Sequence, residues 1–454
     1  MESVQALRQY FETGATQSYT FRLAQLEKLK ASVQQHEVDI FEALHKDLRK
    51  SKEECWITEN GFFLSEIGVA IKQLKSWMQP KKVTTNLLNF PSKSYIVPEP
   101  LGVTLIISPW NYPFQLLLTP LIGAIAAGNC VVLKPSELAP ATAAVIKKII
   151  ESTFDKNYIL YVEGDGATVV PELMNNFVFD HVFYTGSTAV GKIIYSLAAK
   201  NLVPVTLELG GKSPCVVTAN AHIDIAAKRI AMPKFSNAGQ MCVAPDYILV
   251  HRSVKDALID ALKKNIQSFF GDNPQQSDYY GRIINAKQFD RLCQYLQDGK
   301  ILMGGQFDHT DLYIAPTLIE ITDLNKGIMQ DEIFGPILPI ITYDDDAAAL
   351  KIIAQHKNPL AMYVFTNNTT EEQQWIKAVP FGGGCINNAS LHLTNHRLPF
   401  GGRGASGLGN YHGRFSFDTF SHKKAIMKTP NWLDLALKYP PYTGKLSLFK
   451  KAIK

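Results

Sequence analysis

The chain has 454 residues, of which 46% are hydrophobic, so it can bury more than one core and is expected to form at least two domains. Its formal net charge of +5 comes from 46 basic and 41 acidic residues spread along the sequence, without the basic stripe that nucleic-acid binding requires. The six cysteines show no C-x-x-C spacing, which favours reduced thiols over disulfides or a zinc site and indicates a cytoplasmic location.

The segment before Pro80 has helical periodicity, as the apolar residues Phe21, Leu23 and Leu26 illustrate. It predicts a layer of helices that ends at this proline. The first residues lack the basic and apolar regions of a secretory signal, so no export is expected. Residues 83–100 are typical of extended chain, and we expect them to leave the compact body as an arm or hairpin.

Residues 100–133 contain no charged side chain, and this run exceeds the roughly 20 apolar residues that a membrane-spanning helix needs. Three prolines and the pair Gly128-Asn129 interrupt it, however, and divide it into a strand at 103–108, a helix and a second strand at 130–134. Continuous apolar strands are typical of a parallel sheet that is covered on both faces. We therefore predict a buried sheet here and no transmembrane span.

After residue 100, strand and helix signals alternate as they do in right-handed βαβ units. A second alternating region begins at Pro214 and ends near Asn388. The predicted fold class is α/β, with a Rossmann-like parallel-sheet domain, a second α/β domain and a small oligomerisation arm. The predicted boundaries are 1–82 with 101–207 for the first domain, 208–410 for the second, and 83–100 with 411–454 for the arm and C-terminal segment. Ligands in such folds lie at the carboxyl ends of strands and between domains, so we expect a cleft near residues 185–245.

Cys242 stands among small and polar residues that suit a loop exposing its sulfur, whereas Cys130 and Cys215 lie in valine-rich segments typical of buried strands. A cysteine is a useful nucleophile only as the thiolate, which requires a lowered pKa. Glu208 ends an apolar strand beside two glycines, where partial burial would raise its pKa toward that of a useful base. Taken alone, Glu208 equally fits a surface acid. Together, Cys242 and Glu208 are interpreted as a nucleophile and its base.

Asn111 follows a strand, so its amide can point into the cleft and stabilise an oxyanion, although a strand-end asparagine alone equally fits a turn. Residues 184–191 follow a strand and begin a helix, where glycines let the backbone approach a pyrophosphate, but they depart from G-x-G-x-x-G. Residues 402–407 match that spacing without a preceding strand and are interpreted as a glycine-rich loop. His392 and His396 are four residues apart on no predicted helix, so no metal site is expected.

These segments resemble the aldehyde dehydrogenase superfamily, and the likeness covers essentially the whole chain. The motifs that carry it are, in chain order, Pro109-Trp110-Asn111, Lys134-Pro135-Ser136-Glu137, Thr185-Gly186-Ser187, Glu208-Leu209-Gly210-Gly211-Lys212, Gly239-Gln240-Met241-Cys242, Glu332-Ile333-Phe334-Gly335-Pro336 and Leu398-Pro399-Phe400-Gly401-Gly402. The short N-terminal part and residues 411–422 are similar to the class 3, fatty-aldehyde branch.

The resemblance implies that Cys242 is the nucleophile, that Glu208 is the general base, and that Asn111 forms the oxyanion hole with the Cys242 backbone N–H. It also implies cofactor contacts, which are Lys134 and Glu137 at the adenosine ribose, Thr185, Gly186, Ser187 and Gly191 at the pyrophosphate, Glu332 at the nicotinamide ribose, and Phe334 at the nicotinamide ring. The implied reaction is oxidation of medium- or long-chain aliphatic or aromatic aldehydes to carboxylic acids through a cysteine thiohemiacetal and thioester. NAD is the first choice of cofactor and NADP the second, and a homodimer is expected.

Two alternative functions remain. An acylating dehydrogenase would pass the thioester to coenzyme A, where a water-activating Glu208 has no obvious use. A catalytically idle binding protein of the same fold would have no need of the intact site. Residues 442–454 mix basic and apolar side chains as a membrane-surface segment does, and at most weak surface contact is expected there. Phe62, Phe63 and Tyr112 are expected either to line an apolar substrate entrance or to belong to the core.

Overall fold

The computed structural model describes residues 2–452. Met1, at which the expectation about export begins, and Ile453 and Lys454, the last two residues of the predicted membrane-surface segment, lie outside the described residues. Across residues 2–452, none of the helices has both the length and the apolar character that crossing a membrane requires. The uncharged run at 100–133 is divided instead into β3 (Val103–Ile107), α6 (Gln115–Ala127) and the start of β4 (Cys130–Lys134), as its prolines and the pair Gly128-Asn129 predicted.

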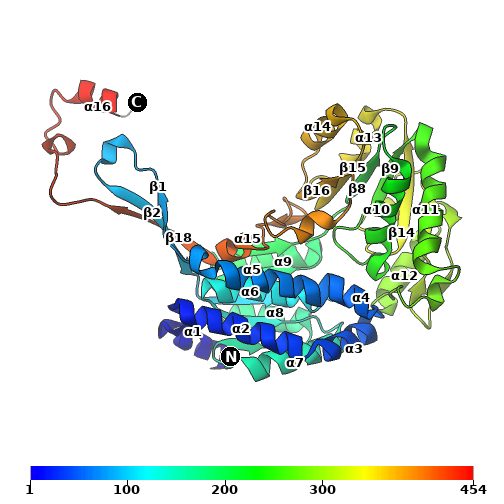
Figure 1. Ribbon diagram of the computed structural model, residues 1–454, viewed down its shortest axis with the longest axis horizontal. Coiled ribbons are helices and arrows are strands. Elements are labelled where there is room, and N and C mark those ends of the chain that lie inside the picture. The colour runs from blue at the N-terminus through cyan, green and yellow to red at the C-terminus, as the bar shows by residue number, and fades with distance from the viewer. Residues whose placement is uncertain (1, 453–454) are drawn as a thin grey trace.

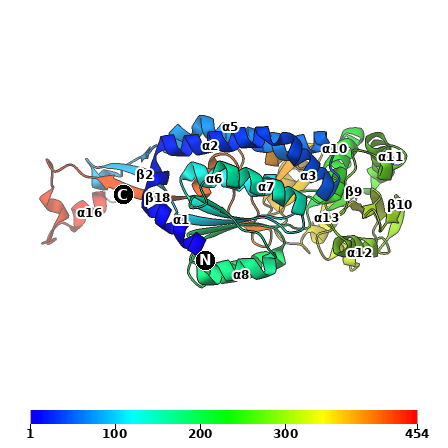
Figure 2. The same ribbon diagram turned by 90° about the horizontal axis from the view of Figure 1, so that it is seen from below.

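Residues 2–77 form the predicted helical layer. Its α-helices are α1 (Glu2–Glu12), α2 (Tyr19–Gln35), α3 (Glu37–Leu48), α4 (Lys52–Cys55) and α5 (Gly61–Trp77), with a π-helical turn at Trp56–Asn60 between the last two. Apolar side chains at helical spacing, such as Leu26, Leu29 and Val33 of α2, are completely buried. Helices α2, α3 and α5 cover α6 and α7, and α8 lies on the opposite face of the first sheet (Figure 2).

The first sheet has six strands in the order β17-β7-β6-β3-β4-β5, of which all but β17 run parallel. Its strands are β3 (Val103–Ile107), β4 (Cys130–Lys134), β5 (Ile159–Tyr161), β6 (His181–Thr185), β7 (Val205–Glu208) and β17 (Gly407–Leu408). The helices that connect or flank them are α6 (Gln115–Ala127), α7 (Pro140–Thr153), α8 (Gly166–Asn176), α9 (Thr188–Ala199) and α15 (Arg414–Thr419). The parallel strands and their crossover helices confirm the predicted Rossmann-like sheet.

The second sheet has seven strands in the order β10-β13-β14-β9-β8-β15-β16 and is parallel except for the pair β10 and β13. Its strands are β8 (Pro214–Val217), β9 (Tyr247–His251), β10 (Lys300–Met303), β13 (Thr317–Glu320), β14 (Ile337–Tyr343), β15 (Ala361–Phe365) and β16 (Gly383–Ile386). Around it lie α10 (Ile223–Phe235), α11 (Lys255–Phe270), α12 (Ala286–Tyr295), α13 (Asp346–Ile353), α14 (Thr369–Ala378) and the small hairpin of β11 (Phe307–Asp308) and β12 (Tyr313–Ile314) (Figure 1).

A third, antiparallel sheet forms an arm that projects from the body (Figure 1). It consists of β1 (Lys81–Val83), β2 (Lys93–Pro100) and β18 (Ser421–Lys428), and the chain beyond it reaches α16 (Leu446–Ala452). The residue boundaries predicted for the domains stay a prediction. Strand β17 pairs with β7, and α15 contacts α6. Residues 407–419 therefore lie against the first sheet, and neither in the arm nor in the part built around the second sheet, which we call the second body.

Candidate functional site

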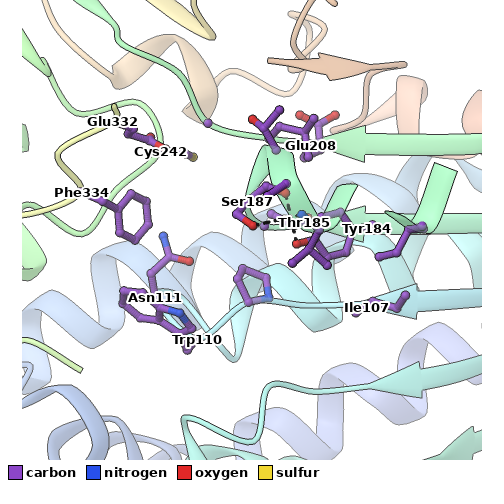
Figure 3. Close-up of a pocket in the computed structure, with 18 of the residues that line it drawn as sticks. Ile107, Trp110, Asn111, Tyr184, Thr185, Ser187, Glu208, Cys242, Glu332 and Phe334 are labelled. Carbon is purple, nitrogen blue, oxygen red and sulfur yellow. Dashed lines mark hydrogen bonds between the residues drawn. The ribbon is translucent and has the colours of Figure 1, made fainter. Parts of the chain in front are cut away.

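Four functional side chains follow parallel strands of the first sheet at the same edge. Asn111 comes after β3, Lys134 ends β4, Thr185 ends β6 and Glu208 ends β7. Because the carboxyl ends of parallel strands meet at one edge, this is where an open α/β fold binds its ligand. A cavity of about 1090 Å³ opens at that edge, and Cys242 approaches it from the second body (Figure 3).

The start of α9 forms one wall of the cavity. Ser187 is its N-cap, with Oγ accepting the Val190 N–H, and the Gly186 N–H donates to the Glu208 carbonyl at 3.0 Å. A Cβ on Gly186 would overlap the Tyr184 hydroxyl. Gly191 does not line the cavity, because it lies inside α9 where a Cβ would be 2.7 Å from Leu209. Its role there is to let the helix approach β7.

Two charged residues at the end of β4 lie in the same cavity. Lys134 is buried, and its Nζ donates to the Pro135 carbonyl at 2.6 Å and to Glu137 Oε2 at 3.2 Å. The Glu137 side chain is 41% exposed and faces Gly166, where a Cβ would be 3.6 Å from its carboxylate. The pair therefore presents one carboxylate and one ammonium group to a ligand that carries hydroxyls.

Glu332 and Phe334 approach the cavity from the second body. The Glu332 carboxylate lies so close to Gly210 that a Cβ there would overlap it, which explains the need for glycine at this position. Phe334 has a left-handed backbone with φ 51°, unusual for an aromatic residue, and its ring meets Trp110 edge to face at 5.3 Å. Arg291 Nη2 donates to the Ile333 carbonyl at 2.7 Å.

Asp246 ties this segment to the glycine motif. Its Oδ1 accepts the Ile333 N–H at 2.9 Å, and its Oδ2 accepts from Lys212 Nζ at 2.6 Å. Lys212 also donates to the carbonyls of Ile328 and Asp331. Asp246 and Arg291 were missed by sequence reasoning, because nothing in their local segments signals a contact with residues more than 40 positions away.

The cavity fits a dinucleotide. It combines the N-terminus of a helix of 12 residues, a cation, and carboxylates toward both ends of the cavity, with glycines where a Cβ would clash. In addition, the buried Thr185 hydroxyl has no hydrogen-bond partner within residues 2–452. Ala405 and Ser406 of the glycine-rich loop also line the cavity, and the Ala405 carbonyl accepts from Thr188 Oγ1 at 3.1 Å. That loop was not expected to contribute.

The nucleophile loop, which we define as residues 236–242, begins where α10 ends. Asn237 and Ala238 both adopt left-handed backbone conformations, each with φ 50°. The Gln240 side chain supports the loop from within: Nε2 donates to the carbonyls of Asn237 and Arg282, and Oε1 accepts the Ile284 N–H at 3.0 Å. Cys242 is partly exposed at the end of this loop, in agreement with the sequence, whereas Cys130 and Cys215 are fully buried.

Asn111 contacts the nucleophile loop directly. Its Nδ2 donates to the Gln240 carbonyl at 3.0 Å, and its backbone carbonyl accepts from Asn237 Nδ2 at 2.7 Å. One amide hydrogen of Asn111 is thus used to fix the side chain, and a primary amide has a second hydrogen to donate. Asn111, Glu208 and Cys242 line the same cavity (Figure 3).

Glu208 is buried more completely than its position at a strand end indicated. Only 2% of the residue is exposed, and neither carboxyl oxygen has a hydrogen-bond partner within residues 2–452. Burial without compensation disfavours the charged form and raises the pKa of Glu208 well above its ordinary value. Burial therefore favours the protonated form of this carboxyl group.

The Cys242 thiol is also held in its neutral form. Burial raises its pKa to about 12, and the charges of Glu332 and Glu208 add to the effect. Burial, together with the charge of Asp246, likewise raises the pKa of Glu332 to about 8. The lowered pKa that was expected for Cys242 from the sequence is therefore not found in this structure, because burial raises it instead.

This pKa predicts how a thiol reagent reacts with the free protein. Since only the thiolate is alkylated, the rate at which iodoacetamide modifies Cys242 should rise about tenfold per pH unit from about pH 7 to pH 10. Mass spectrometry of the peptide containing Cys242, after timed quenching, measures that rate. A rate that levels off below about pH 8 would show that the thiolate already forms there and would contradict the prediction.

The aromatic residues Phe62, Phe63 and Tyr112 were expected either at an apolar substrate entrance or in the core. Phe63 is fully buried against Phe114, so it belongs to the core. Phe62 contacts the His412 ring at 5.3 Å, and Tyr112 stacks under Lys50, whose Nζ is 3.9 Å from the ring centre. None of these three lines the large cavity. His392 lies in a short 3-10 helix, and within residues 2–452 no group of metal-ligating side chains forms a site.

Comparisons with known proteins identify the family. The aldehyde dehydrogenase family model matches residues 2–426. The chain is 50% identical to a 4,4'-diaponeurosporen-aldehyde dehydrogenase of Staphylococcus aureus over 98% of this chain and 97% of the relative. It is 45% identical to aldehyde dehydrogenase family 3 member H1 of Arabidopsis thaliana, over 99% and 94%.

Comparisons with solved structures lead to the same family as the comparisons of sequence. A substrate-bound Staphylococcus aureus AldH superimposes with a TM-score of 0.97 at 49% identity, covering 100% of this chain and 99% of that one. Solved proteins with the same fold include one in complex with NAD+ and one in complex with NADP. The predicted α/β fold, the class 3-like likeness and the oxidoreductase class are thereby confirmed, and the chain belongs to the aldehyde dehydrogenase family.

Proposed function

We propose that this aldehyde dehydrogenase oxidises medium- or long-chain aliphatic or aromatic aldehydes with NAD(P), by covalent catalysis at Cys242. The supporting observation is that Cys242, Glu208 and Asn111 line the same cavity as a dinucleotide-shaped set of groups. Lys134 and Glu137 would hold the adenosine ribose, Thr185, Gly186 and Ser187 the pyrophosphate, and Glu332 the nicotinamide ribose beside Phe334. Gly191 would contribute only through the placement of α9. When bound, NAD(P)+ supplies the hydride acceptor.

In the proposed reaction the Cys242 thiol gives up its proton to solvent water and its sulfur bonds to the aldehyde carbon. The electron pair of the C=O bond moves to the carbonyl oxygen, which becomes negatively charged. The second amide hydrogen of Asn111 and the Cys242 backbone N–H would stabilise that oxygen. After oxidation, the acyl group remains on sulfur as a thioester, and Glu208 takes a proton from the water that hydrolyses it. Since burial raises the pKa of Glu208 and the base must be deprotonated, this step should accelerate as the pH rises.

NAD is the proposed first choice of cofactor. Glu137 is partly exposed inside the cavity, where its carboxylate can accept from a ribose 2′-hydroxyl and would repel a 2′-phosphate. Lys134 lies 3.2 Å from that carboxylate and reduces the repulsion, so NADP is ranked second. Glu137→Gln should therefore raise KM for NAD and lower it for NADP.

A kinetic comparison tests the proposed activity. The protein is incubated with NAD or NADP and with aliphatic aldehydes of increasing chain length, benzaldehyde, or no aldehyde, and the reduced nicotinamide is followed by its absorbance. We expect kcat/KM to increase with chain length and to be larger with NAD. Addition of coenzyme A should leave the product a free acid. No reduction with any aldehyde would favour an idle binding protein, and an acyl-coenzyme A product would favour the acylating alternative.

We further propose a cytoplasmic homodimer in which the arm joins two copies. Large apolar side chains at the arm are exposed, with Leu87 82% and Phe90 62% accessible, and covering them would remove apolar surface from water. The proposed domains are those predicted from the sequence, with 407–419 reassigned to the cofactor-binding body. Light scattering should give twice the chain mass, whereas replacement of both arm residues by serine should shift it to the monomer. A wild-type monomer mass would contradict the proposal.

A further inference from the structure

A buried ion pair lies beneath Asn111 and takes no direct part in the proposed chemistry. Lys50, between α3 and α4, and Glu59, in the π-helical turn, have fully buried side chains, with Nζ 2.7 Å from Glu59 Oε1. Lys50 Nζ also donates to the Asn111 carbonyl at 3.2 Å. Glu59 Oε2 accepts the Gln115 N–H at 2.8 Å, at the start of α6. The pair therefore holds the backbone on both sides of the Trp110-to-Phe114 turn.

A second acid from the same segment reaches the nucleophile loop. Glu54 Oε1 accepts the backbone N–H of Asn237 at 2.7 Å, across 183 residues of sequence. The Asn237 side chain in turn donates to the Asn111 carbonyl, the same oxygen that Lys50 contacts. Residues 50–59 thus contact both Asn111 and the loop that presents Cys242.

Energetics indicate that this network does more than stabilise the fold. Taking two charges out of water is costly for each ion, so a buried pair adds little net stability. Asn237 and Ala238 are consecutive left-handed residues, a conformation that is strained for alanine and persists only where the surroundings enforce it. The Glu54 hydrogen bond to the N–H of Asn237, the first residue of this left-handed pair, is such an enforcing contact. Glu54 lies in α4, directly before the π-helical turn that carries Glu59, and such turns often occur at functional sites.

We propose that Lys50, Glu54 and Glu59 are positioning residues that set the geometry of the Cys242 loop and of the Asn111 amide. They act through the backbone of Asn237 and Asn111 and do not contact the reacting atoms. The inference deepens the proposed function, because it assigns to the N-terminal helices the alignment of the nucleophile with the oxyanion donor. A displacement of about 1 Å in such an alignment is sufficient to lower a rate on the order of 100-fold.

Three variants of neighbouring acids test the proposal. Glu54→Ala removes the acceptor, Glu54→Gln retains an oxygen that can accept the Asn237 N–H, and Glu53→Ala alters an exposed acid one position away. We expect Glu54→Ala to lower kcat by roughly 10–100-fold with KM for NAD within about twofold of wild type. Glu54→Gln should recover to within about threefold, and Glu53→Ala should match wild type. Lys50→Met should resemble Glu54→Ala.

A cofactor-free measurement separates this inference from the proposed function. The rate of Cys242 alkylation by iodoacetamide requires neither aldehyde nor NAD, and we expect Glu54→Ala to change it at least about fivefold while Glu54→Gln and Glu53→Ala do not. Wild-type rates in Glu54→Ala, or equal defects in the alanine and glutamine variants, would overturn the proposal. If Glu54→Ala does not fold, Glu54→Asp takes its place in the test, because its side chain is one methylene shorter and moves the acceptor away from the Asn237 N–H. Impaired kcat and altered alkylation in that variant support positioning, and wild-type values overturn it.

Discussion

Replacement of Cys242 by alanine is expected to lower kcat for aldehyde oxidation at least about 10⁴-fold, because no group remains to form the covalent intermediate. Cys242 is the cysteine that lines the cavity together with Glu208 and Asn111. Binding of NAD should change little, since Cys242 is not among the residues proposed to hold the cofactor. Cys242→Ser should be almost as inactive, because a serine hydroxyl is a far weaker nucleophile than a thiolate. Initial rates of NAD reduction and a calorimetric titration with NAD measure the two effects.

Two other partly exposed cysteines provide the matched controls. Cys293 lies in α12, and Cys385 lies in β16 with its sulfur 3.7 Å from His392 Nδ1. Neither lines the large cavity, so Cys293→Ala and Cys385→Ala should retain kcat to within about twofold. A Cys242→Ala variant that keeps more than about 1% of the rate would contradict covalent catalysis at this residue. Loss of activity in Cys385→Ala instead would assign the nucleophile to that thiol.

The sequence predicted the sheets well because burial on both faces leaves a local signal. The strands β3, β4 and β6 are mostly apolar, every residue in them is buried, and glycine or proline marks several of their ends. Parallel topology then determined that the residues following these strands meet at one edge. That reasoning was sufficient to bring Asn111, Thr185 and Glu208 into one cavity.

What the sequence did not predict depends on contacts between distant segments. The Glu208 carboxyl was expected to be partly solvated, but β17 and the glycine-rich loop cover the end of β7, and the acid is fully buried. Gly191 was assigned to the pyrophosphate by its place in a motif, whereas Leu209 occupies the space that a side chain would need. Neither the return of the chain at residue 407 nor the packing of α9 has a signal in the local pattern.

The two neutral groups of the site have a shared physical origin. Desolvation by the surrounding protein raises the pKa of both the partly exposed Cys242 and the buried Glu208, which favours the neutral form of each. A thiolate and a carboxylate side by side would repel each other, and a protonated Glu208 removes that repulsion while the sulfur reacts. The base is then required only after the acyl group has neutralised the sulfur. A Glu208 that is neutral while the Cys242 sulfur reacts and charged while the thioester is hydrolysed agrees with a two-step reaction.

Replacement of Glu208 by glutamine is expected to separate those two steps. The first turnover should still reduce NAD, because the amide is as neutral as the protonated acid beside Cys242. Thioester hydrolysis loses its base, so steady-state kcat should fall roughly 10²–10³-fold. Stopped-flow absorbance should show a burst near one equivalent per site followed by a slow phase. Asn111→Ala provides the contrast, because loss of an oxyanion donor should reduce the burst rate itself.

The same substitution should make the protein more stable, with a defined pH dependence. The pKa of Glu208 in the folded state is raised above that in the unfolded chain, about 4.3, so its contribution to stability is complete below that pH and is lost as pH rises toward the folded pKa. The wild type then loses up to about 1.4 kcal/mol per pH unit in that window, a loss that Glu208→Gln lacks. Urea unfolding of the two proteins between about pH 5 and pH 8 measures the difference.

Glu66→Gln is a control of opposite sign. Burial acts to raise the pKa of Glu66, but the interaction with His412, 3.5 Å away, and the Gly413 N–H outweigh it and lower the pKa. Its stabilisation is therefore present above the unfolded pKa and lost as pH falls, so Glu66→Gln should be less stable than wild type near pH 7, with the gap closing in acid. A buried base at position 208 would be contradicted if Glu208→Gln turned over at the wild-type rate. It would also be contradicted if the stability advantage of Glu208→Gln over the wild type did not grow as the pH rises.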